Sequence, residues 1–355
     1  MHYFCTLFDR NYFSRGLALY RSLQRQGDFK LCILCMDDFT CQALNKLALK
    51  NIIPISLNEM EDPKLLAIKP DRTAQEYCWT VTPSLIRYCL NKFEPDACTY
   101  LDADMYFFQS PEDLLSILPE DRHVMITPHN YAPQYDLSAT SGKYCVQFMV
   151  FRNTQEGREV LEWWRDACIE WCYARFEDGK FGDQKYLDDW LQRFPEVVFE
   201  LDHHGAGVAP WNVIQYKILG KSGRLCVRHN GRDYPAVFYH FHGLRIGPER
   251  LYFNEYRLQS KAIESFYRPY MEELQQISKN YSPALGNADL HGMRDVPADS
   301  GRTMGAFLTD YLRSNAGSLL RLMQAFIGIQ AWRRWQTRNT FPSTAFVRSR
   351  ESANG

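Results

Sequence analysis

The stretch YLDADMYFF, residues 100–108, places Asp102 and Asp104 between an apolar run and an aromatic run. The residues that lead into it, 97–101, are apolar and β-prone, which predicts a short buried strand that ends at the carboxylates. Two carboxylates at the end of such a strand can turn outward together and hold a divalent cation through oxygen. Because an Asp-x-Asp triplet is short enough to occur by chance, the remainder of the chain has to supply its context.

Three β-prone runs precede this stretch and alternate with two amphipathic segments. The expected strands are residues 2–8, 30–36 and 52–57, and the expected helices are residues 12–26 and 39–49. Strands that alternate with helices form a mostly parallel sheet with helices packed on its faces. Ligands of such sheets collect at the carboxyl ends of the strands, where this pattern places Asp9, Asp102 and Asp104. The sequence therefore predicts an α/β fold with a site at this edge.

The later segments continue the α/β pattern and then change character. The polar residues 58–77 are expected to form a loop, and Pro83 to begin a helix that leads into the central strand. Further strands are expected at residues 123–127, 144–151, 197–201 and 236–241, and further helices at residues 155–176 and 251–274. The expected division of the chain is a globular domain at 1–280, a linker at 281–301, a basic helical tail at 302–340 and a disordered end at 341–355.

Composition restricts the class of protein. The 355 residues are 45% hydrophobic, which is enough for a large core, and the net charge of −1 gives no basic signature for nucleic acid. The first residues lack the basic region of a signal peptide, and no apolar run reaches the roughly 18 residues of a membrane span. The eleven cysteines show no repeated C-x-x-C spacing. We therefore expect a cytoplasmic protein with free thiols.

The C-terminal tail is electrostatically distinct from the rest. Residues 301–355 contain eight arginines against Asp310 and Glu351. Within residues 318–338, apolar side chains recur at helical spacing and are followed by tryptophans and arginines. This pattern is typical of a helix that lies on an anionic membrane surface. A helix packed on its own domain or on a partner is the alternative.

Five patches, in this order along about residues 1–250, resemble the metal-dependent, nucleotide-sugar-binding glycosyltransferases of GT-A type, in particular glycosyltransferase family eight, to which glycogenin belongs. The patches are Thr6–Tyr12, Arg87, residues 100–104, Asp183-Gln184 and residues 240–243. The resemblance implies a GT-A (Rossmann-like) fold, with a mixed, mostly parallel sheet flanked by helices and a C-terminal helical extension.

The resemblance also assigns roles to residues. It implies that Asp102, Asp104 and His240 bind Mn²⁺ or Mg²⁺, with His242 either in the interior or supporting the ligands, so that the metal can stabilise a departing nucleotide diphosphate. The other residues that it places at the site are Thr6, Asp9, Tyr12 and Ala103 for the nucleotide donor, Arg87 near the sugar and diphosphate, Asp183 and Gln184 beside the anomeric carbon, and Trp211 and Asn212 at the acceptor. Structural roles, such as helix caps, buried aromatics and solvated charges, are the alternatives for these residues.

Two departures from the family pattern affect the donor site. The family's Asn-x-Gly is replaced by Cys145-Val146-Gln147, which leaves Gln147 as the candidate substitute for a sugar-binding Asn. The family's Lys-Pro-Trp is replaced by Leu244–Pro248, where Arg245 is a candidate for the diphosphate-binding Lys although its register differs by one.

We therefore expect a glycosyltransferase that moves a sugar, with retention at the anomeric carbon, from a nucleotide diphosphate onto a saccharide or lipid-linked glycan. A UDP-sugar is the donor that the resemblance favours, and glycan assembly at the inner face of a bacterial membrane is the expected setting. Two alternatives remain open. One is a non-catalytic nucleotide-sugar binder or scaffold, and the other is a hydrolase that uses His240-Phe241-His242 as a metal site.

Overall fold

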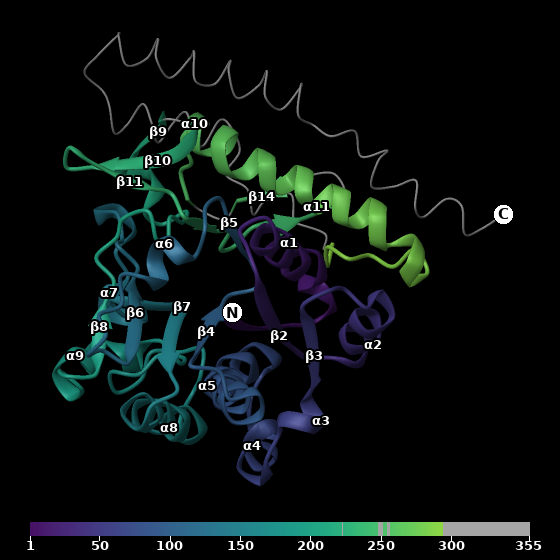
Figure 1. Cartoon of the computed structure of the whole chain (residues 1–355), viewed down its shortest axis with the longest axis vertical. Helices are drawn as coiled ribbons and strands as arrows, with labels where there is room; N and C mark the ends of the chain where they lie inside the picture. The colour runs from purple at the N-terminus through teal and green to yellow at the C-terminus, as the bar shows by residue number, and fades with distance from the viewer. Residues whose placement is uncertain (222, 248–250, 254–255, 294–355) are drawn as a thin grey trace.

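The computed structural model describes residues 1–221, 223–247, 251–253 and 256–293, and its centre is a seven-stranded mixed sheet (Figure 1). The strand order is β3-β2-β1-β4-β7-β6-β8. Strand β7 runs antiparallel to its neighbours β4 and β6, and the other neighbouring pairs are parallel. The strands are β1 (His2–Phe8), β2 (Phe29–Cys35), β3 (Ile52–Ser56), β4 (Ala97–Leu101), β6 (Val124–Pro128), β7 (Tyr144–Arg152) and β8 (Val198–Glu200). The predicted mostly parallel α/β sheet is confirmed.

Helices cover both faces of this sheet, which explains why its strands are apolar throughout. In β1, Phe4 and Phe8 face one hydrophobic core, whereas Cys5 and Leu7 face the other. The first core contains side chains of α1 (Phe13–Gln24), α2 (Asp38–Leu47), α6 (Glu112–Leu115), α10 (Ser260–Ala262) and α11 (Arg268–Tyr281). The second contains side chains of α3 (Leu57–Met60), α4 (Pro63–Ile68), α5 (Ala74–Phe93), α8 (Gln155–Glu170) and α9 (Trp190–Arg193).

Short elements complete the described part of the chain. The smaller sheets are β5 (Met105–Phe107) with β12 (Phe238–His240), β9 (Lys217–Lys221) with β10 (Arg224–His229) and β11 (Arg232–Pro235), and β13 (Arg245–Ile246) with β14 (Leu251–Tyr252). The single helical turns are η1 (Arg10–Tyr12), η2 (Lys69–Asp71), η3 (Pro133–Tyr135), α7 (Ser138–Ser141), η4 (Lys185–Asp189), η5 (Val213–Gln215), η6 (Ile263–Tyr267) and η7 (Pro283–Leu285). Within the described residues, no helix combines the length and the apolarity that a bilayer crossing requires.

The prediction of a loop at residues 58–77 is wrong, because this segment contributes to α3, α4 and the start of α5. Asp62 caps α4, which has Pro63 in its first turn. Helix α5 begins at Ala74 rather than at Pro83, because Thr73 and Glu76 form a reciprocal capping box. The helix expected at 251–274 is also wrong over its first part, since β14 pairs with β13 there and helical structure begins at Ser260.

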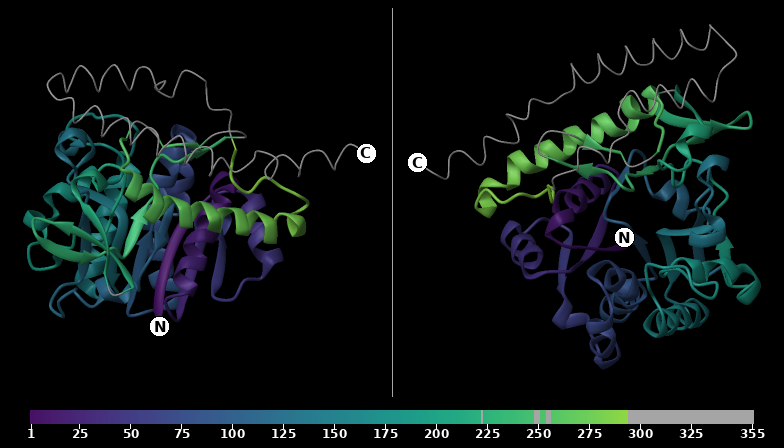
Figure 2. Two further views of the ribbon diagram at one scale, coloured as in Figure 1. Left: turned by 90° about the horizontal axis from the view of Figure 1, so that it is seen from above. Right: turned by 180° about the vertical axis from the view of Figure 1, so that it is seen from behind.

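The C-terminal part of the described chain packs on the N-terminal part. Helix α11 lies across α1 (Figures 1 and 2), and Glu273 joins them through ion pairs of 2.7 Å to Arg21 and 2.8 Å to Arg25. Beyond α11, Leu290 and His291 are fully buried, and the Leu290 carbonyl accepts a hydrogen bond from the Ser14 amide. The start of the segment expected as a linker thus belongs to the packed structure. The expected tail at 302–340 and disordered end at 341–355 lie outside the described residues.

We expect Glu273→Ala to lower the free energy of unfolding by about 2 kcal/mol, because it leaves two arginines without their carboxylate. The loss stays below that of a fully buried pair, since Arg21 and Arg25 retain access to water. Urea unfolding followed by circular dichroism measures it. Glu272→Ala, one position earlier on the exposed side of α11, is the matched control. Equal stability of the two variants would contradict this role of Glu273.

We also expect His291 to cause part of the loss of folding stability at acidic pH. Burial lowers its pKa to about 4, with the Arg15 charge adding to this effect and Asp289 opposing it. The unfolded chain therefore binds this proton more readily, so the contribution is intact above pH 6.5 and falls by roughly 2 kcal/mol by pH 4.5. Urea unfolding at pH 7 and pH 4.5 should show a smaller pH-dependent loss for His291→Asn than for the wild type. An unchanged pH-dependent loss would exclude His291 as its source.

Candidate functional site

A cleft of about 870 Å³ opens where the central strands end. Asp9 follows β1 and Asp102 follows β4, so the predicted meeting of strand ends is observed. Asp183, Trp211 and His240 line the same cleft from later parts of the chain. Residues that are distant in the sequence thus share one cavity.

Strand pairing brings His240 to the two aspartates. Strand β12 pairs antiparallel with β5, which places His240 opposite Met105, the residue after Asp104. The His240 Nε2 atom lies 3.1 Å from Asp104 Oδ1 and 3.8 Å from Asp102 Oδ2. The backbone strengthens this arrangement, because the Phe241 amide donates to the Asp104 carbonyl over 2.9 Å.

Gln147 sets the orientation of the His240 ring. Its Oε1 atom lies 2.7 Å from His240 Nδ1, so Nδ1–H donates to it and Nε2 is left to face the carboxylates. Gly207 permits this position of Gln147, because a Cβ at Gly207 would lie 2.5 Å from Gln147 Nε2 and its φ of +79° favours glycine. The Trp211 ring packs edge-on against His240 at 5.2 Å.

The three side chains perturb one another electrostatically. Burial and the charge of Asp104 raise the pKa of Asp102 to about 6, against the opposing effect of His240. Burial also disfavours ionised Asp104, but the nearby His240 outweighs it and lowers the pKa of Asp104 to about 2. The carboxylates in turn raise the pKa of His240 well above its usual range, although its burial acts in the opposite direction. The two acids therefore favour the protonated form of the His240 imidazole.

The donor atoms of this cluster fit a divalent cation. Two carboxylates and one oriented imidazole nitrogen are ligands that Mn²⁺ and related ions accept. A cation would replace the His240 proton as the positive charge between the acids. Cys145 also belongs to this group, because its Sγ atom, an Asp102 oxygen and a His240 nitrogen lie within 4.8 Å of one another.

Asp183 and Gln184 lie in the cleft, as predicted. Asp183 is buried, and its burial together with the charge of Asp102 raises its pKa well above the usual value. Its carbonyl accepts a hydrogen bond from the Trp164 indole over 2.9 Å. The Gln184 amide donates to the Ser141 carbonyl over 2.7 Å, which fixes its direction.

Four of the five residues expected to bind the nucleotide donor line the cleft. Asp9, Tyr12, Ala103 and Arg245 line it, with the Tyr12 ring 40% exposed and able to stack on a base. Thr6 is the exception, since it is fully buried within β1 and does not line the cleft.

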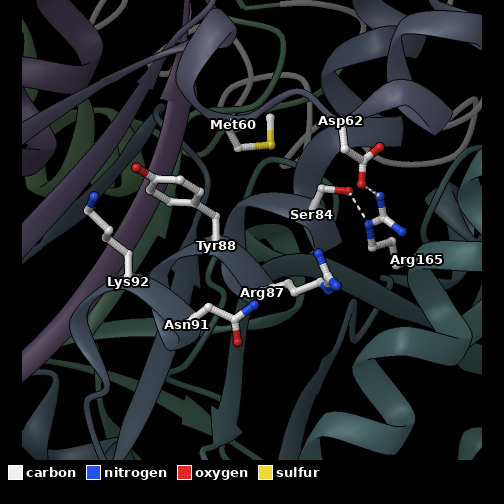
Figure 3. A pocket seen from close by; sticks show the side chains of 8 residues that line it. All are labelled: Met60, Asp62, Ser84, Arg87, Tyr88, Asn91, Lys92 and Arg165. Atoms are coloured by element: carbon white, nitrogen blue, oxygen red, sulfur yellow. Dashed lines mark hydrogen bonds and ion pairs between the residues drawn. The ribbon is translucent and has the colours of Figure 1, made fainter.

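Arg87 does not belong to this site, so the expectation that it binds the sugar and diphosphate is corrected. It lies in a separate pocket of about 250 Å³ beside Arg165 (Figure 3), and its Nε donates to Glu162 over 2.5 Å. The cause is helix register. On α5, Gln75, Cys78, Trp79 and Thr82 line the cleft.

Two residues expected to bind sugar or acceptor instead support the site from behind, because neither Gln147 nor Asn212 lines the cleft. The Asn212 side chain accepts from the Ala209 amide and donates to the carbonyls of His129 and Gly207, which uses its hydrogen-bonding capacity on the loop itself. Trp211 does line the cleft, and its indole donates to the His129 carbonyl over 2.8 Å.

Sequence reasoning missed several residues of the cleft. Arg15 lines it, is buried, and donates to the carbonyls of Asn11, Leu244 and His291 at 2.9–3.0 Å. Its guanidinium lies 4.6 Å from the Tyr12 ring centroid. The helical spacing of Gln75, Cys78, Trp79 and Thr82 could have indicated a cleft-facing stripe. The contacts of Arg15 with the distant end of the chain left no local signal.

Comparisons with known proteins give two relatives and several similar folds. No protein-family model matches the chain. The uncharacterized protein YfnF of Bacillus subtilis (strain 168) is 33% identical over 251 residues, which cover 68% of this chain and 82% of YfnF. The uncharacterized protein YfnD of the same organism is 30% identical over 283 residues, which cover 77% of this chain and 89% of YfnD.

Solved structures with a similar fold include the galactosyltransferase LgtC in complex with donor and acceptor sugar analogs, with a TM-score of 0.48 and 13% identity over 77% of this chain and 95% of LgtC. Mouse xyloside xylosyltransferase 1 has a TM-score of 0.45 and 11% identity over 68% of this chain and 98% of its own. The bifunctional glycosyltransferase WbbM has a TM-score of 0.44 and 13% identity over 86% of this chain and 51% of its own. Because these identities and TM-scores are low, the chemistry of the site is inferred from its own side chains.

We expect Gln147→Ala to weaken Mn²⁺ binding about tenfold, because the imidazole loses the partner that aims Nε2 at the carboxylates. Electron paramagnetic resonance of free Mn²⁺ during a titration measures the affinity. Gln155→Ala, an exposed glutamine on α8, is the control and should bind as the wild type does. Unchanged affinity in Gln147→Ala would exclude this orienting role.

Proposed function

The chain belongs to the family that contains YfnF and YfnD of Bacillus subtilis, and we propose that it transfers a sugar from a nucleotide diphosphate to a saccharide or lipid-linked glycan. The observation that carries this proposal is the Asp102, Asp104 and His240 cluster at the floor of a large cleft. Such a donor set suits a cation that binds diphosphate oxygens. The class of reaction is inferred from the five sequence patches that resemble glycosyltransferases in their order along the chain.

Metal binding is the first part of the proposed mechanism. Asp102, Asp104 and His240 would hold Mn²⁺ or Mg²⁺, which would supply Lewis-acid stabilisation of the departing diphosphate. Arg245 lies at the exposed side of the cleft, where its guanidinium can contact phosphate oxygens. Buried Arg15 adds positive charge nearby, although its hydrogen bonds are directed to backbone carbonyls. Together these groups favour a dianionic leaving group.

Donor binding and sugar positioning use the remaining lining residues. The exposed Tyr12 ring offers a stacking face for a base, and Asp9 offers carboxylate oxygens beside it. Asp183 and Gln184 line the cleft and would face the sugar, where a carboxylate can stabilise positive charge that develops at the anomeric carbon. The Trp211 face offers an apolar platform for an acceptor saccharide. Retention and a UDP-sugar donor are the outcomes that the family resemblance favours.

A non-catalytic nucleotide-sugar binder is the second candidate, favoured by one observation. The residue that replaces the family's sugar-binding Asn, Cys145, carries no amide, and Gln147 is turned toward His240 instead of into the cleft. Such a protein would keep the nucleotide pocket and the metal donors but lack turnover. Catalysis therefore has to be measured separately from binding.

We expect Asp104→Asn to reduce donor hydrolysis and sugar transfer by roughly a hundredfold or more, because it removes one charged metal ligand. The assay follows release of nucleoside diphosphate from UDP-, GDP- and CDP-sugars with Mn²⁺, and a thermal-shift panel of the same compounds reports binding. Asp96→Asn, an exposed aspartate just before β4, is the control.

The outcomes separate the candidate functions. Stabilisation by one diphosphate only with metal, together with turnover that Asp104→Asn loses, supports the transferase. Binding without turnover in the wild type supports the binder. Wild-type turnover by Asp104→Asn would refute the proposed metal site, and turnover of a substrate without any nucleotide would favour the hydrolase.

A further inference from the structure

Cys145 lies among the proposed metal ligands. It is the second residue of β7, next to the end of β4, and it lines the cleft with 4% of its surface exposed. Its Sγ atom, an Asp102 oxygen and a His240 nitrogen are mutually within 4.8 Å. Ala209 and Trp211 pack on its apolar side, which shields the sulfur from bulk water. The thiol is therefore beside the acids in a sheltered position.

The position of Cys145 follows from the same strand pairing that builds the site. Strand β7 is antiparallel to β4, and the Asp102 amide donates to the Gln147 carbonyl over 3.1 Å. Gln147 therefore lies beside Asp102, with its side chain on His240, and Cys145 precedes it by two residues in the part of β7 where the register with β6 shifts. One strand thus supplies both the residue that orients His240 and a sulfur atom close to it.

We propose that Cys145 supplies a thiolate ligand to the cation held by Asp102, Asp104 and His240, an inference that rests on the metal site of the proposed function. Donor atoms that bind one ion at about 2.0–2.3 Å lie roughly 3–4.6 Å apart, and those of Asp102, His240 and Cys145 are mutually within 4.8 Å, so small side-chain movements would bring these three to a shared ion. On binding, the Cys145 thiol and protonated His240 would each release a proton to the buffer as a sulfur–metal bond and a nitrogen–metal bond form.

A sulfur ligand changes which cation the site prefers. Thiolate favours Zn²⁺, Co²⁺ and Fe²⁺, whereas carboxylates and imidazole alone accommodate Mn²⁺ and Mg²⁺ well. Two carboxylates, one imidazole and one thiolate also leave two positions of an octahedron for the diphosphate of the donor. The site would thus prefer softer metal ions and still leave room for substrate oxygens.

Co²⁺ titration of the full chain under reducing conditions tests this proposal, because a cobalt–thiolate bond gives a strong near-ultraviolet charge-transfer band. The wild type should show this band with one Co²⁺ bound. Cys145→Ser should lose the band and bind Co²⁺ about tenfold or more weakly, while its Mn²⁺ affinity changes less than about threefold. Circular dichroism confirms that the variant is folded.

A second thiol group provides the necessary control. Cys5, Cys89 and Cys98 cluster inside the sheet core, away from carboxylates, and could also bind cobalt. If Cys98→Ala removes the band and Cys145→Ser retains it, the signal comes from the core and the proposal for Cys145 fails. Co²⁺ binding without any band also overturns it, while the proposed function stands. Absence of Co²⁺ and Mn²⁺ binding overturns the metal site itself, and Cys145 with it.

Discussion

The antiparallel pairing of β5 with β12 is the constraint on which the site depends. It joins the strand that follows the Asp pair to a strand that ends at His240, and thereby fixes a nitrogen 3.1 Å from Asp104. A slip of one residue would turn His240 to the opposite face and leave two carboxylates buried together. Aromatic packing protects the register, since Phe107 and Phe238 contact each other at 5.5 Å beneath the site.

Much of the fold was accessible from the sequence because its strands are uniformly apolar. In β1 and β2 alternate residues face different cores, so continuous apolar runs indicate a sheet covered on both sides. The segment at 58–77 was misjudged because overall polarity outweighed its local capping signals. Asp62 with Pro63, and Thr73 with Glu76, mark the starts of α4 and α5. The pairing of β13 with β14 could not be predicted, since two-residue strands leave no periodicity.

The candidate site was predictable where it follows from strand ends and not where it depends on long-range packing. Asp9 and the Asp pair meet because parallel strands share an edge, and the family resemblance supplied His240. Arg87 was misplaced because one helix carries both a cleft-facing stripe and a surface pocket. The contacts of Arg15 with His291, 276 residues away, depend on how the described C-terminal segment packs, which no local pattern encodes.

The electrostatics of the site favour the cation that we propose for it. Three carboxyl groups, those of Asp102, Asp104 and Asp183, are close enough to raise or oppose one another's ionisation, and burial removes the water that would screen them. Burial is the largest cause of the raised pKa values of Asp102 and Asp183, a neighbouring carboxylate adds to each, and His240 opposes the rise at Asp102. A divalent ion supplies twice the charge at the same place without requiring a proton on the imidazole. The fold therefore holds the acids in an arrangement that a cation stabilises more completely than a proton can.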